Sequence, residues 1–90
     1  MKLAEKIILN NTPERVLTYQ KKEMLAEYLF TEFTSGSALL NGYIHEKALI
    51  QKLGFESIPL AQLREYLAEQ GFVFEPAEAL PHYNLIKLPY

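Results

Sequence analysis

Apolar and polar positions follow two different periods along this 90-residue chain. Apolar residues recur at helical spacing in residues 13–33, again in 46–53 and again in 59–70, which predicts three helices that each bury one face. In residues 72–75 and 83–88 the side chains alternate with the period of a strand, which predicts a hairpin. The pattern therefore predicts an α+β domain that is mainly helical.

Capping residues indicate where these helices begin and end. Thr12 and Pro13 form a typical helix start, because threonine caps the free amides of the first turn and proline fits its first position. Ser57 is the expected cap of the third helix. Gly54 is expected to end the second helix in the left-handed conformation that glycine adopts easily.

Two shorter segments complete the expected set of elements. Residues 2–9 place Leu3, Ile7 and Ile8 at near-helical spacing, which favours a short amphipathic helix, with an edge strand as the alternative. Residues 38–40 are expected to form one helical turn that fills the core. The inner faces of the elements predict a core made of Leu25, Leu29, Leu49, Leu53, Leu60, Leu63, Leu67, Phe72 and Ile86.

A short strand ending at Ile44, two helices in quick succession and a hairpin follow one another in residues 43–88. This order resembles the winged helix-turn-helix superfamily. The resemblance implies one winged domain over residues 1–90, with three or four helices and a small antiparallel hairpin as its wing. It also implies DNA binding as the commonest use of the fold, with the second helix of the motif in the major groove and the wing at the backbone.

The charge distribution argues against DNA as the ligand. Residues 56–90 hold the expected recognition helix and wing, and they carry two basic residues against five glutamates, a net charge of −3. The groove-facing residues would be Gln62, Glu65 and Glu69, and glutamates repel the phosphates that supply most non-specific affinity for DNA. Four lysines could form a compensating basic patch: Lys21, Lys22, Lys47 and Lys52. They are more simply interpreted as solvated positions on helix faces.

An acidic helix with flanking aromatic residues suits a protein surface better than DNA, and tyrosine is common at protein interfaces. We therefore predict a small non-enzymatic regulatory protein that binds a basic protein partner and inhibits a nucleic-acid-handling protein. The alternative is a winged-helix DNA-binding transcriptional regulator. The predicted partner-binding residues are Gln62, Glu65, Tyr66, Glu69 and Tyr83.

No constellation of residues in the sequence indicates an enzyme. The chain has no cysteine, its two histidines are His45 and His82, and it has no Gly-rich phosphate loop or G-x-S-x-G elbow. His45 is expected to cap a helix. Glu65 and Glu69 together supply fewer oxygen ligands than a hard metal ion needs. The prediction is a protein with no catalytic residue, no cofactor and no metal.

No segment of the sequence is long and apolar enough to span a membrane, and residues 1–9 are too short and too charged for a signal peptide. The absence of cysteine fits a reducing compartment, so a cytoplasmic protein without membrane contact is expected. The apolar residues of the segment 2–9 predict a homodimer that uses this segment and part of the long first helix.

Overall fold

The computed structural model describes residues 15–90, which form four helices and three short strands. The helix expected at residues 2–9 and the helix start expected at Thr12 lie outside this part of the chain. In chain order the elements are α2 (Tyr19–Thr34), α3 (Ser37–Asn41), β1 (Ile44–His45), α4 (Glu46–Leu53), α5 (Leu60–Glu69), β2 (Val73–Pro76) and β3 (Asn84–Lys87).

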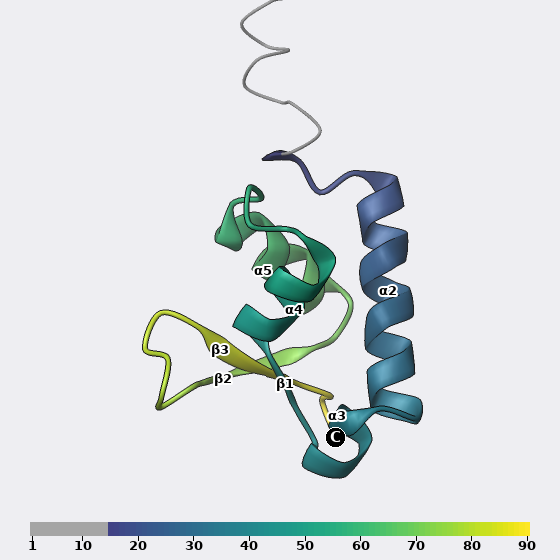
Figure 1. Ribbon diagram of the computed structural model, residues 1–90, viewed down its shortest axis with the longest axis vertical. Helices are drawn as coiled ribbons and strands as arrows, with labels where there is room; N and C mark the ends of the chain where they lie inside the picture. The colour runs from purple at the N-terminus through teal and green to yellow at the C-terminus, as the bar shows by residue number, and fades with distance from the viewer. Residues whose placement is uncertain (1–14) are drawn as a thin grey trace, which may run out of the picture.

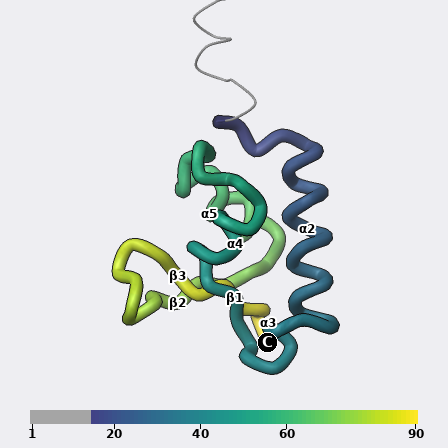
Figure 2. Tube along the Cα trace, in the orientation of Figure 1, coloured from purple at the N-terminus to yellow at the C-terminus, as the bar shows by residue number. Residues whose placement is uncertain are grey.

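The three strands form one antiparallel sheet in which β3 lies between β1 and β2. Ile86 of β3 is opposite Ile44 on one side and opposite Phe74 on the other. In Figure 1 helix α2 runs along one side of the molecule, the β2–β3 hairpin projects from the other, and α4 and α5 lie between them. The tube in Figure 2 follows the same path. The expected α+β class is confirmed.

The core lies where α2, α4, α5 and β3 meet. Six of the predicted core residues are buried there: Leu25, Leu29, Leu49, Leu63, Leu67 and Ile86. Leu53, Leu60 and Phe72 are only partly buried and pack against the edge of this cluster. The core also takes in Ala38, from the turn that was expected to fill it, and five residues outside the nine predicted ones, namely Leu17, Ile44, Ile50, Phe55 and Ile58.

Helix α2 begins six residues later than the pattern predicted and ends one residue later. Thr18 is its N-cap, with an extended backbone and a side-chain oxygen that accepts a hydrogen bond from the amide of Lys21. The preceding residue, Leu17, is buried, and its amide donates to the side chain of Gln62. The helix starts late because Leu17 leaves the helical direction to reach the core.

Helix α3 forms at the predicted place but does not fill the core as expected. Ala38 is buried, whereas Leu39 and Leu40 point outward and Leu40 is 88% exposed. The helix is a single turn between Gly36 and Gly42, so one small side chain reaches the core and its neighbours cannot. This expectation was wrong for both leucines.

In the turn between α4 and α5, the prediction for Gly54 is confirmed and the prediction for Ser57 is wrong. Gly54 has a φ of 72°, and Phe55, which follows it, is buried against the last turn of α4. Ser57 does not cap the next helix. Helix α5 starts after Pro59, which takes the N-cap position without a side-chain hydrogen bond. Proline already sets the backbone angle that the first turn needs.

Strand β2 begins and ends one residue later than the predicted 72–75, β3 is one residue shorter at each end than the predicted 83–88, and β1 joins them as a third strand. An ion pair between Lys87 and Glu75 joins the two hairpin strands across the β2–β3 ladder. No helix of the described chain combines the length and the apolar character needed to cross a bilayer.

Candidate partner-binding face

A buried carboxylate lies at the junction of α4, α5 and the hairpin. The Glu46 side chain is completely buried at the first turn of α4. Its two oxygens accept from Nε and Nη2 of Arg64 at 2.9 and 2.7 Å, and Oε1 also accepts from the backbone amide of Asn84 at 3.0 Å. Arg64 further donates to the carbonyl of His82 at 3.2 Å. One carboxylate therefore joins two helices to the base of the hairpin loop.

This ion pair engages the guanidinium of Arg64, the one basic residue of α5. Hydrogen bonding to Glu46 raises the pKa of Arg64 above its usual value, so Arg64 is always charged. Its fork geometry is already used by two carboxylate oxygens. Because Lys87 pairs with Glu75, both basic residues of the segment 56–90 are in ion pairs. Both Arg64 and Lys87 therefore already have a carboxylate partner that a phosphate would have to replace.

Four of the five predicted partner-binding residues share one face of α5. Gln62, Glu65, Tyr66 and Glu69 line a shallow hollow of about 190 Å³ together with Leu17 and Lys22. Helical spacing explains this grouping, because residues three, four and seven apart lie on one side of a helix. The hollow lies between α5 and the first part of α2.

The four residues differ in how free they are to meet a partner. Gln62 is half-buried and already accepts the hydrogen bond from the Leu17 amide. Tyr66 is half-buried, with the ammonium of Lys22 5.1 Å from its ring centroid, a cation–π contact. Glu65 and Glu69 are exposed, and neither forms an ion pair within residues 15–90. The fully exposed charges on this face are therefore acidic, beside the half-buried Lys22 of α2.

Tyr83, the fifth predicted residue, lies elsewhere. It is half-buried at the end of the hairpin loop and lines a different hollow, of about 440 Å³, with Leu60, Ile58 and Phe55. Its backbone closes the loop, because its amide donates to Leu80 and its carbonyl accepts from Ala77. The structure does not bring Tyr83 together with the other four predicted partner-binding residues.

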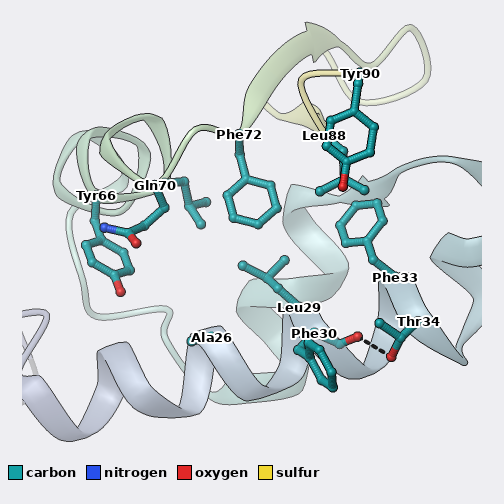
Figure 3. Close-up of a pocket in the computed structure, with 11 residues that line it drawn as sticks. Ala26, Leu29, Phe30, Phe33, Thr34, Tyr66, Gln70, Phe72, Leu88 and Tyr90 are labelled. Atoms are coloured by element: carbon teal, nitrogen blue, oxygen red, sulfur yellow. Dashed lines mark hydrogen bonds between the residues drawn. The ribbon is translucent and has the colours of Figure 1, made fainter.

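An apolar groove elsewhere on the molecule was not anticipated from the sequence. It has a volume of about 410 Å³ and lies between α2, the end of α5 and the last residues of the chain (Figure 3). Leu29 and Leu67 line its depth, and the rings of Phe33 and Phe72 meet at its side with centroids 6.1 Å apart. The sequence feature that could have indicated this groove is Phe30, an aromatic residue one position away from the buried stripe of α2.

The histidines show no catalytic arrangement. His45 is the N-cap residue of α4, as expected, but its side chain makes no capping hydrogen bond and its Nδ1 is buried without a partner. Its ring meets Tyr43 edge-on, with centroids 5.4 Å apart. Within residues 15–90 there is no group of three or more histidine, aspartate or glutamate side chains arranged to hold a metal ion.

Comparisons with protein-family models, with curated proteins and with solved structures found no match to this chain.

Proposed function

We propose that this chain is a small non-enzymatic regulatory protein that binds a basic protein partner through the acidic face of α5. The observation that carries the proposal is the bidentate ion pair between Arg64 and the buried Glu46. It engages the one basic side chain of α5, which remains partly exposed, with a buried carboxylate. The exposed charges that remain on the helix are Glu65 and Glu69.

Electrostatics favours a cationic protein surface over DNA as the ligand of this face. A protein gains affinity for a duplex chiefly by neutralising phosphates with Lys and Arg, and each missing cation weakens binding. Two exposed carboxylates attract a basic partner and accelerate its association. A nucleic-acid-handling protein has such a basic surface, so the proposed partner is of that class and the proposed effect is inhibition by occupying its phosphate-binding site. The absence of cysteine fits the proposed cytoplasmic location.

The second candidate is a winged-helix DNA-binding regulator. It is favoured by the order of the elements, in which a short strand and two successive helices precede an antiparallel hairpin, and by the sheet that joins β1 to that hairpin. In a winged helix α5 would lie in the major groove. Glutamate does have one use there, because it accepts a hydrogen bond from cytosine N4.

Titration at low salt separates the two candidates. The unmodified protein is titrated with mixed-sequence duplex DNA and, separately, with an arginine-rich peptide as the probe for a basic surface. We expect the peptide to bind and the duplex not to bind. Tight binding to the duplex that weakens steeply with salt would support the DNA-binding candidate instead. Binding to neither probe would contradict the proposed acidic face.

Charge reversal locates the binding face. The double variant Glu65→Lys/Glu69→Lys should slow association with the peptide about tenfold or more at low salt and create affinity for duplex DNA. The matched control is Glu27→Lys/Glu56→Lys, which changes the net charge equally at exposed positions outside α5. Stopped-flow fluorescence measures both. Equal effects of the two double variants would show that net charge, and not this face, governs binding.

A further inference from the structure

The hollow between α5 and the first part of α2 already holds a cation of the chain itself. Lys22 of α2 lines it together with Glu65, Tyr66 and Glu69 of α5. The ammonium of Lys22 lies 5.1 Å from the centroid of the Tyr66 ring, which Figure 3 shows extending from α5 toward α2. The face of an aromatic ring attracts cations through its quadrupole. The ring of Tyr66 is therefore a cation-binding group on the acidic face of α5.

Lys22 does not neutralise the two carboxylates beside it. Glu65 and Glu69 are exposed, and neither is in ion-pair contact with the Lys22 ammonium. Two carboxylates and one ammonium leave the lining of the hollow with a net charge of −1. The hollow therefore still attracts a cation from outside the chain.

The position of Lys22 in α2 makes its ammonium easy to displace. It is the fourth residue of the helix, and no acidic residue lies in the first turn of α2 to offset its charge. The start of a helix carries a partial positive charge, so a cation is unfavourable there. The lysine stem is also long and flexible. The contact that holds the ammonium in the hollow is therefore the one with Tyr66.

We propose that the hollow is a site for an arginine side chain of the basic partner, whose guanidinium displaces Lys22 from the ring of Tyr66. This inference rests on the proposed binding of a basic protein through α5. A guanidinium is planar and weakly hydrated, so it stacks on an aromatic face while its N–H groups donate to carboxylates. Tyr66 supplies the ring, and Glu65 and Glu69 supply the carboxylates.

The size of the hollow suits a single side chain. Its volume is about 190 Å³. This is roughly the space of six water molecules at about 30 Å³ each, which is too little for a helix or a strand of a partner. The hollow therefore receives one cationic head group, and the rest of the partner lies outside it.

Lys22 gives the site its preference for arginine over lysine. A lysine of the partner would exchange one ammonium for another on the same ring and would gain little. An arginine gains the stacking and the fork of N–H donors that Lys22 lacks. Because Lys22 repels both kinds of cation equally, it raises the threshold for binding and leaves the better ligand favoured.

Calorimetric titration with an arginine-rich peptide and a lysine-rich peptide of equal length, at about 0.15 M salt, tests the proposal. The arginine-rich peptide should bind more tightly. Lys22→Met should tighten its binding about fivefold, because the competing cation–π contact is removed. The matched control is Lys47→Met, which removes the same charge from a half-buried lysine in the first turn of α4, outside the hollow. Its effect should be smaller, since salt screens exposed charges away from the site.

A double-mutant cycle tests the role of the Tyr66 ring. Tyr66→Leu should cost more affinity in the Lys22→Met variant than in the unmodified protein, because only the variant leaves the ring unoccupied. Tyr66→Phe keeps the ring and should bind the arginine-rich peptide like the unmodified protein. Circular dichroism checks that each variant is folded. A readout without any change to Tyr66 is NMR with arginine amide, which should shift the Tyr66 ring resonances more in Lys22→Met than in the unmodified protein.

The outcomes separate this inference from the proposed function. Equal effects of Lys22→Met and Lys47→Met would overturn the inference, while weaker binding by Glu65→Lys/Glu69→Lys would still support the acidic face. Tighter binding of the lysine-rich peptide would also overturn it. Binding of neither peptide by the unmodified protein and by Lys22→Met would overturn the proposed function and the inference together.

Discussion

At the scale of single residues, the buried Glu46 determines the role of Arg64, because it binds the Arg64 guanidinium. Among the described residues Glu46 is the charged side chain with no exposure, while the Arg64 side chain is 34% exposed. Burying a carboxylate is costly unless it is paired and hydrogen-bonded. Here two guanidinium donors and the Asn84 amide meet that requirement. The pair is therefore a structural element, and its consequence for binding is that Arg64 is occupied.

Glu46→Gln should lower the free energy of unfolding by about 2 kcal/mol, because it removes the charge that pairs with Arg64. The value lies below the usual 3–5 kcal/mol for a broken buried pair, since water can reach the partly exposed guanidinium. Arg64→Met should cost more, because it leaves the buried carboxylate without a cation. Urea denaturation measures both. The control Glu75→Gln, in an exposed pair, should change stability by less than about 1 kcal/mol.

At the scale of single elements, the start of α2 illustrates competition between local and tertiary preferences. Thr12 with Pro13 and Thr18 are both reasonable helix starts by local chemistry. The chain between them includes Leu17, which is buried, and a helix continued backward through this residue would not place its amide against Gln62. The tertiary contact selects Thr18 as the cap. It also positions the hollow between α2 and the acidic face of α5.

Thr18→Ala should destabilise the protein by about 1 kcal/mol, because the amide of Lys21 loses its side-chain acceptor and the helix start loses its cap. Thr31→Ala, within the same helix at an exposed position, should be neutral or slightly stabilising, since alanine is the better helix former. Thermal unfolding followed by circular dichroism compares the two. Equal losses at both positions would argue that Thr18 is not the cap.

At the scale of the whole molecule, one apolar cluster connects α2, α4, α5 and β3. Leu63 and Leu67 of α5 are at its centre, with Leu25 of α2 and Leu49 of α4 also buried there. A domain of this size has no second core to support one element when another is lost, so its elements are expected to unfold together. The proposed binding face on α5 therefore depends on this core.

Leu63→Ala should cost about 2–5 kcal/mol, the usual range for a fully buried leucine. The loss should be equal when unfolding is followed by helical circular dichroism and by tyrosine fluorescence, because the transition is cooperative. Leu40→Ala makes the same chemical change at an exposed position of α3 and should be nearly neutral. Two separate transitions would contradict the single core.

The local pattern of the sequence predicted which helices and strands form, but not which of them pack against one another. Helix α4 has its predicted bounds, 46–53, and Gly54 ends it as expected, because helical periodicity and capping depend on residues a few positions apart. The same periodicity found the buried leucines of α2 and α5 and grouped Gln62, Glu65, Tyr66 and Glu69 on one face. The winged-helix assignment and the protein-binding role stay predictions.

The tertiary structure decided everything that joins residues distant in the chain. The partners Glu46 and Arg64 are 18 residues apart, and Leu17 and Gln62 are 45 apart, so no local period connects them. Phe30 and Phe33 are equally apolar, yet only Phe33 meets a ring, that of Phe72, while Phe30 is exposed. Exposure and pairing depend on what packs against each face of a helix. This packing is determined when the helices and strands assemble, and not when each one forms.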